Sequence, residues 1–246
     1  MLSPEDRDRL DALRANYPGC VHMDTEEGLV VVRRPTADEF IKIEDSVVTL
    51  VDLGAKLNPY AGLDAIKAVV VYPSTDRVEA LLNDYARFFG QLVNMSRQAV
   101  RGSALGASAV KVDLRDEELY MRESPTEEGR STKRAGGRIF AVESFRIESD
   151  KDGRPQRVVT GRHLMRRLGL IEDRKLTKDI TANGYTDAEG NRQPRNATLA
   201  EIARSHVVEA PGCTVPDWEA RPDLLTLLGQ AVIAQSSIGA GSASGK

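Results

Sequence analysis

The sequence predicts an α+β protein in which a mainly helical N-terminal domain with a β-hairpin precedes a C-terminal region of mixed β-hairpin and helix. Helix-capping signals come before apolar residues at helical spacing in the first hundred residues. Short β-rich runs flank glycine-containing turns in both halves. Charge also divides the chain, because residues 1–128 hold 15 Lys/Arg against 23 Asp/Glu, whereas residues 129–246 hold 19 against 14. This asymmetry indicates two regions with different partners, or two regions that face each other.

The first predicted element is a helix close to the N-terminus. Ser3 is a favourable N-cap, Pro4 suits the first helical position, and Asp6 lies where a capping-box acid would. Pro18-Gly19 ends the helical pattern. The apolar residues at helical spacing in between are Leu10, Leu13 and Tyr17.

A hairpin and a second helix follow. The extended runs 20–23 and 29–34 flank a turn at 24–28, which is typical of a β-hairpin. Thr36 and Glu39 have the spacing of a capping box, so we expect a helix to begin there. The apolar face of this helix is formed by Phe40, Ile43 and Val47.

The rest of the N-terminal half is less regular at first. Segment 50–57 leads into a turn at 58–60, and the run from Leu63 suits a buried helix, although 68–72 could instead be a strand. Ser74 is expected to cap another helix. Its apolar residues recur every three or four positions and are Val78, Leu81, Leu82, Tyr85, Phe88, Phe89 and Leu92.

The C-terminal half begins with strands. Residues 110–114 are a candidate strand, and residues 117–121 follow it. Residues 139–147 and 157–160 are β-rich and flank the turn 149–155, which predicts a second hairpin with a long loop.

Helices and loops complete the C-terminal half. Residues 163–170 are expected to form a short helix that ends near Gly169, and residues 183–194 a loop region. Thr198 is the expected cap of a short helix through Ala203. A last, apolar helix is expected to open at Pro222, just after the only tryptophan; its apolar residues are Leu224, Leu225, Leu227, Leu228, Val232 and Ile233.

These elements define the expected domain organisation. Residues 1–123 form the mainly helical domain, and residues 139–238 form the mixed region. Residues 124–138 are polar, rich in glycine and without hydrophobic anchors, which predicts a linker or mobile loop. Residues 239–246 are Gly/Ser/Ala-rich and are expected to be a flexible tail.

Composition excludes several classes of protein. No apolar run approaches the roughly 20 residues of a membrane-spanning helix, and the acidic N-terminus does not resemble a signal peptide. Cys20 and Cys213 are the only cysteines, which excludes a disulfide framework and favours a reducing compartment. With three histidines besides, no zinc-finger spacing exists.

No catalytic, cofactor-binding or metal-ligating residue is expected, and no cofactor. The histidines His22, His163 and His206 are scattered, and no nucleophile elbow is present. Residues 129–133 lack the glycine–lysine–hydroxyl order of a phosphate-binding loop. The acidic residues at 113 and 116–118 lack the glycine and terminal glutamate of a calcium loop and are more typical of a solvated face.

Basic residues crowd one stretch of the second half. From Lys151 to Lys178 there are nine Lys/Arg against three Asp/Glu. Arg162, Arg166 and Arg167 are therefore candidate contacts to nucleic acid or to an acidic partner, and the alternative is a solvated face. The whole chain is acidic and shows no DNA- or RNA-binding signature, so nucleic acid is the less favoured partner.

The N-terminal elements also resemble a known family. The hairpin ends in Val-Val-Val-Arg-Arg-Pro-Thr-Ala-Asp-Glu-Phe at 30–40, Ala-Val-Val-Val-Tyr-Pro-Ser follows at 68–74, and a helix with Ala80-Leu81-Leu82 and Tyr85 comes next. Over roughly residues 5–100 this order resembles the tail assembly chaperones of tailed bacteriophages. Some members carry a second segment after the first, a part that residues 125–246 could play.

The resemblance implies a non-enzymatic function. Such proteins bind the long helical tape-measure protein and help to recruit tail-tube subunits, in the host cytoplasm during assembly. An apolar groove of a helical protein can take an amphipathic partner helix. The alternatives are a structural component that stays in the virion, at the tail or baseplate, and, less favoured, a nucleic-acid-binding accessory protein. Oligomeric state is left open.

Overall fold

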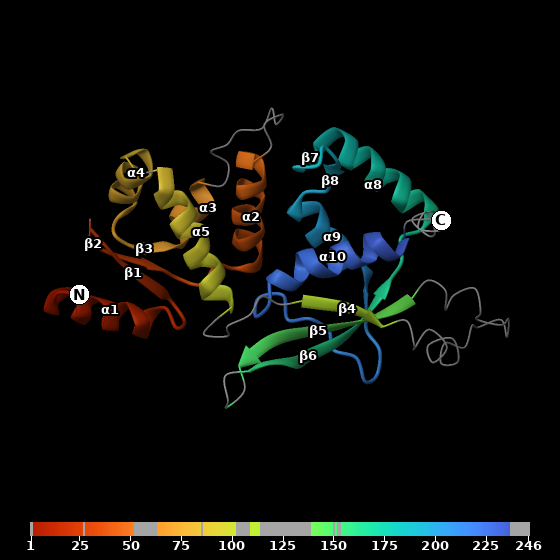
Figure 1. Cartoon of the computed structure of the whole chain (residues 1–246), viewed down its shortest axis with the longest axis horizontal. Helices are drawn as coiled ribbons and strands as arrows, with labels where there is room; N and C mark the ends of the chain where they lie inside the picture. Colours follow the sequence, from red (N-terminus) through yellow and green to blue (C-terminus); the bar gives the residue numbers. More distant parts are fainter. Residues whose placement is uncertain are drawn as a thin grey trace. The chain divides into compact units, whose positions relative to one another are not determined.

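The computed structural model describes residues 2–26, 28–51, 63–84, 86–101, 109–113, 139–149, 151 and 154–236. The fold is α+β, as the sequence predicts (Figure 1). The chain divides into two units, Met1–Ala104 with Glu219–Pro222, and Leu105–Trp218 with Asp223–Lys246. The expected linker, C-terminal tail and turn at 58–60, and residues 117–121, lie outside the described residues.

The first unit contains helices on both sides of a small antiparallel sheet with the strand order β1-β2-β3. Its elements are α1 (Pro4–Asn16), β1 (Val21–Thr25), β2 (Gly28–Val32), α2 (Ala37–Val51), α3 (Leu63–Val69), β3 (Val70–Tyr72), α4 (Thr75–Asp84) and α5 (Ala86–Arg101).

Local signals in the sequence account for the starts of α1 and α2. The Ser3 hydroxyl accepts the Asp6 N–H at 3.1 Å, as expected of an N-cap. At α2 the capping box closes in both directions, because the Glu39 N–H donates to the Thr36 hydroxyl at 3.3 Å and the Thr36 N–H to the Glu39 carboxylate at 2.9 Å. The sequence left open whether the run from Leu63 stays helical or becomes a strand at 68–72. Both occur, since α3 ends at Val69 and β3 begins at Val70.

Strand β2 is buried on both faces and forms the centre of the unit. Val30 and Val32 pack in a core with Ile43, Ile66 and Leu92 from the helices α2, α3 and α5. The residues that alternate with them, Leu29 and Val31, point the other way and pack against Leu10 of α1. Period-two alternation therefore gives the strand two apolar faces, each covered by helix.

A short segment from late in the sequence belongs to the first unit. The Glu219 carboxylate accepts the Ala37 N–H at 3.0 Å, at the N-terminus of α2. The Arg34 guanidinium donates to the Ala220 carbonyl. A carboxylate at this place satisfies a backbone donor that the helix itself leaves unpaired.

The second unit is an antiparallel sheet with the order β4-β5-β6-β9, against which helices pack. Its elements are β4 (Ala109–Asp113), β5 (Ile139–Ser149), β6 (Pro155–Arg166), α8 (Leu170–Asn183), β7 (Tyr185–Thr186), β8 (Arg192–Gln193), α9 (Asn196–His206), β9 (Val207–Val208) and α10 (Asp223–Ser236). The predicted hairpin is β5–β6, and the predicted apolar helix is α10. Strand β4, placed by the sequence in the 1–123 domain, pairs with β5.

Two local predictions in this unit are wrong. Residues 163–166 continue strand β6 instead of forming a helix, because they pair with residues 139–142 of β5. Gly169 does not end a helix but precedes α8 as its N-cap. The run His-Leu-Met-Arg-Arg-Leu has apolar residues at helical spacing, and the long-range pairing overrides this local pattern.

Two further features of this unit, the start of α9 and the presence of α8, differ from the prediction. Arg195 is the N-cap of α9, so Thr198 lies within the first turn and does not cap it. Helix α8 was not predicted, because buried apolar residues are sparse on it and Leu176 is its one buried residue.

Within the described ranges, no helix has the length and apolar character needed to cross a membrane.

Candidate functional site

An open groove of about 280 Å³ lies between α8 and α9 in the second unit. Leu168, Leu176 and Ile202 form its apolar part. Polar and charged side chains complete the lining, and these are Glu172, Lys175, Asp179, Thr198, Glu201, Ser205 and His206. The groove is small for a site that encloses an organic ligand, which usually measures ~300–1,000 Å³.

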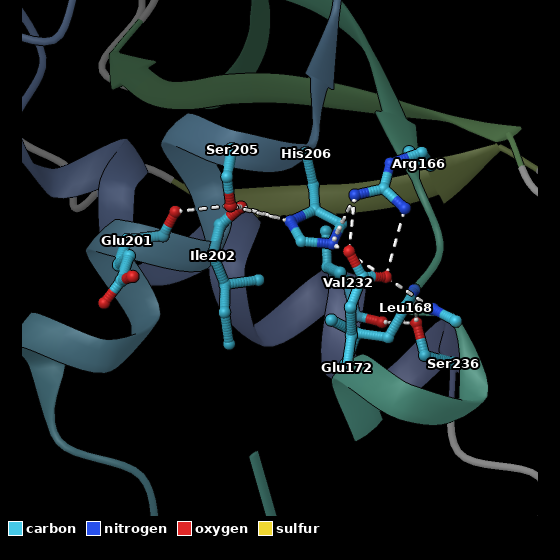
Figure 2. Close-up of polar contacts among 10 residues, drawn as sticks. Arg166, Leu168, Glu172, Glu201, Ile202, Ser205, His206, Val232 and Ser236 are labelled. Carbon is cyan, nitrogen blue, oxygen red and sulfur yellow. Dashed lines mark hydrogen bonds and ion pairs between the residues drawn. The ribbon is translucent and has the colours of Figure 1, made fainter. Parts of the chain in front are cut away.

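An ion pair fixes the N-terminal end of α8 beside this groove (Figure 2). Arg166, the last residue of β6, binds the Glu172 carboxylate through both terminal nitrogens, at 3.1 and 2.8 Å. The same carboxylate accepts the Gly169 N–H at 2.6 Å and so caps the helix. Donation from Arg166, and then from the Gly169 N–H, lowers the pKa of Glu172 to about 2. Glu172 is therefore ionised at neutral pH.

His206, the last residue of α9, adjoins this pair and is only 5% exposed. Its Nδ1 lies 3.0 Å from the Ile202 carbonyl oxygen, and its Nε2 lies 3.2 Å from Nη2 of Arg166. A carbonyl oxygen only accepts, and a guanidinium only donates. We therefore assign the hydrogen to Nδ1, which leaves Nε2 to accept from Arg166. Burial, and then the charge of Arg166, lowers the pKa of His206, which favours this neutral form.

A second group of polar contacts fixes the other end of α8. The Asp179 carboxylate accepts from the Thr198 hydroxyl at 2.9 Å and from the Asn183 amide at 2.8 Å. Arg192 donates to the Thr181 carbonyl at 3.0 Å, and Arg195 donates to the Asn183 carbonyl at 2.8 Å. Helix α8 is thus held at both ends, and the groove lies between these two sets of contacts.

The groove also presents charged and apolar side chains to solvent. Lys175 on α8 and Glu201 on α9 line it and make no ion pair with another described residue. Next to the groove, Leu170 is 58% exposed and Ile171 is 71% exposed. Ile171 lies one helical turn before Lys175, so the two side chains are neighbours on the helix surface.

Another histidine, His163, takes part in a separate buried network on the sheet. The Ser144 hydroxyl lies 2.9 Å from its Nε2, and the Thr214 carbonyl oxygen lies 2.7 Å from its Nδ1. This resembles the serine–histidine pair of hydrolases, but a backbone carbonyl stands where those enzymes place a carboxylate. Ser144 is 1% exposed and His163 is 2% exposed, so neither can reach a substrate in this conformation.

The arginines predicted from the sequence have different surroundings. Arg166 lies in the site, paired with Glu172. Arg162 lies opposite Glu143 in the β5–β6 pairing, and the Arg167 guanidinium lies 5.8 Å from the centre of the Phe140 ring. Contact of these arginines with nucleic acid or an acidic partner stays a prediction.

The remaining candidate residues do not converge on the groove. His22 is exposed on β1 of the first unit. Cys20 and Cys213 are both free thiols and are half-buried in different units. Among the described ranges, no group of His, Cys, Asp and Glu side chains is placed to hold a metal ion. Residues 116–118 and 129–133 lie outside those ranges.

Sequence reasoning missed the acidic residues of the groove and Lys175. One signal could have found the start of α8, because Gly169 and Glu172 have the three-residue spacing of a helix cap. Comparison of the chain with protein-family models, curated proteins and solved structures gives no match.

Proposed function

We propose that the protein is a non-enzymatic polypeptide-binding protein of bacteriophage tail assembly, which contacts tape-measure or tail-tube subunits through the α8–α9 groove. One observation carries the binding function. Two large apolar side chains, Leu170 and Ile171, are exposed and lie in sequence between Leu168 and Glu172, which line an open groove. The apolar part of that lining also includes Leu176 and Ile202. Apolar surface that adjoins polar residues in this way is typical of a protein contact site.

The dimensions and chemistry of the groove favour a partner side chain over an enclosed metabolite. A volume of about 280 Å³ accommodates one or two aliphatic side chains. Covering an Ile or Leu side chain contributes roughly 1.5–3 kcal/mol. An amphipathic helix supplies such side chains along one face, together with charges that can meet Lys175 and Glu201.

The resemblance of residues 5–100 to tail assembly chaperones supports the choice of partner. The order of helix, hairpin and helices on which it depends is present in the first unit. A tape-measure protein is itself a long helical polypeptide, so it offers the kind of surface that the groove accommodates.

Co-purification tests this proposal. The tagged full chain is co-expressed with the tape-measure and tail-tube proteins of the same phage, and the bound proteins are identified by mass spectrometry. We expect one of them to be retained and Ile171→Asp to weaken retention at least about tenfold, because one buried aliphatic side chain is lost.

The matched control is Val159→Asp, because Val159 is also an exposed aliphatic residue, at 55%, but lies on β6 in the hairpin. Retention by this variant should equal that of the unchanged protein. Failure to retain either tail protein, or equal retention by the Ile171→Asp variant, would overturn the proposal. Thermal unfolding of each variant shows whether its fold is intact.

A further inference from the structure

We propose that Arg166, Glu172 and His206 form a proton-sensitive latch, in which protonation of His206 releases the first turn of α8 and weakens partner binding at the groove. The inference rests on the proposed function for its effect on binding, but not for the structural change. The three residues come from β6, α8 and α9 and meet at one end of the groove (Figure 2).

In the neutral state each N–H that joins the three residues of the latch has an acceptor. Nη2 of Arg166 lies 2.8 Å from Oε1 of Glu172 and 3.2 Å from Nε2 of His206, so its two hydrogens serve two partners. The hydrogen on Nδ1 of His206 has two acceptors within reach, the Ser205 hydroxyl at 2.9 Å and the Ile202 carbonyl at 3.0 Å. The arrangement depends on an unprotonated Nε2.

A proton on Nε2 of His206 is incompatible with this arrangement. Two N–H donors and two positive charges would then face each other across 3.2 Å. The nearest anionic acceptor is Oε2 of Glu172, at 3.8 Å. Protonated His206 would therefore compete with Arg166 for the carboxylate that caps α8, and the guanidinium would have to move away.

Charged groups around His206 set the direction of the response. Arg166 faces it from β6 and opposes protonation, whereas Glu172 faces it from α8 and favours it. Helix α10 packs nearby through Val232 and Ser236, and its only charged residue, Asp223, is at its opposite end (Figure 2). On α9 itself, the helix C-terminus favours a cation at His206.

Burial is the largest influence and places the transition on the acidic side. It lowers the pKa of His206 below the ordinary value of 6.5. The folded state binds a proton on His206 less tightly than the unfolded state does. The stabilising effect of neutral His206 is therefore complete above pH 6.5. It is lost as the pH falls below that value.

The latch is connected to the surface used for binding. Glu172 and His206 line the groove, and Leu170 and Ile171 belong to the helical turn that Glu172 caps. Loss of the Arg166 contact removes the ion pair between this turn and the sheet. The exposed apolar pair then loses its fixed position against the groove.

Nitrogen NMR of the full chain without a partner tests the structural step. At about pH 7.5 the hydrogen of His206 should be on Nδ1, and on acidification Nε2 should gain a proton with a midpoint below 6.5. Through the same midpoint, hydrogen-exchange protection of the Asp173 and Lys175 amides should fall about tenfold, as for loss of one charge-assisted hydrogen bond. The Leu228 amide in α10 serves as the reference.

His206→Gln is the matched variant, because its amide oxygen can accept from Arg166 but cannot titrate in this range. In this variant, the Asp173 and Lys175 amides should keep their hydrogen-exchange protection on acidification. If this variant does not fold, the test rests on the unchanged protein, in which protonation of His206 and the loss of amide protection in α8 should have the same midpoint. A hydrogen on Nε2 at neutral pH, or titration of His206 without a change at α8, would overturn the inference.

Repeating the co-purification about one pH unit below the His206 midpoint measured by NMR separates the two proposals. Retention at pH 7.5 that falls on acidification for the unchanged protein but not for His206→Gln supports the latch. Retention that is equal at both pH values overturns the latch and leaves the proposed function standing. Absence of retention at pH 7.5 overturns the proposed function, while the NMR result still judges the structural step.

Discussion

A Cβ atom on Gly229 of α10 would lie 2.3 Å from the carbonyl oxygen of Leu199 on α9. The two helices therefore cross so closely that only glycine fits at the crossing. We expect Gly229→Ala to lower the free energy of unfolding by roughly 1–3 kcal/mol, because the backbone of α9 has to shift. Urea unfolding measures this. Gly90→Ala in α5, where a Cβ meets nothing within 4 Å, should instead raise stability by about 0.5–1 kcal/mol.

The pair Arg166–Glu172 predicts a stability that depends on acid pH. The folded-state pKa of Glu172 is about 2, below its ordinary value of 4.5, so its ionised carboxylate stabilises the fold fully above pH 4.5, whether it binds Arg166 or protonated His206, and progressively less as the pH falls to about 2. Because the Glu172 side chain is 38% exposed and screened by solvent, Glu172→Gln should cost only about 1 kcal/mol near neutral pH. Urea titrations of both proteins should converge on acidification, and a constant difference would contradict the assignment.

The capping box of α2 predicts a local stability effect in the first unit. Thr36→Ala removes the acceptor of the Glu39 N–H and should lower the free energy of unfolding by about 1 kcal/mol. Thr36→Ser keeps the hydroxyl and should stay within about 0.5 kcal/mol of the unchanged protein. Circular dichroism during thermal unfolding compares the three. Equal losses for both variants would show that the methyl group matters and the cap does not.

The buried pair Ser144–His163 predicts structural importance without reactivity. A fluorophosphonate, which labels activated serines, should leave Ser144 unmodified in the folded protein because the hydroxyl is enclosed. Ser144→Ala should lower stability by roughly 1–3 kcal/mol, since Nε2 of His163 loses its hydroxyl partner in a buried place. Mass spectrometry after labelling decides the first point, and modification at Ser144 would argue against a non-enzymatic protein.

The elements that the sequence predicts well are those with signals in neighbouring residues. The caps at Ser3 and Thr36 lie within three residues of their partners, and the hairpin β1–β2 has its turn in the chain between the strands. Strand β6 is different, because residues 163–166 are strand only by pairing with residues 139–142, more than 20 positions earlier. A local pattern does not contain that information.

The site was only partly predictable for the same reason. Arg166 stands out in the sequence as one of several basic residues, but its partners are chosen by the fold. Glu172 lies beyond the turn that follows β6, and His206 comes 40 residues after Arg166. Helix α8 is held by contacts at its two ends more than by an apolar face, and sequence periodicity reports the apolar face alone.

The double burial of β2 has a consequence for how the chain is made. If either face of this valine-rich strand were exposed to solvent, the strand would be prone to aggregation, and exposed apolar strands promote aggregation while a protein is still folding. Helix α1, which covers Leu29 and Val31, precedes β2 in the chain. During synthesis from the N-terminus, α1 therefore leaves the ribosome before β2, and it is available to cover one face of the strand as soon as the strand emerges.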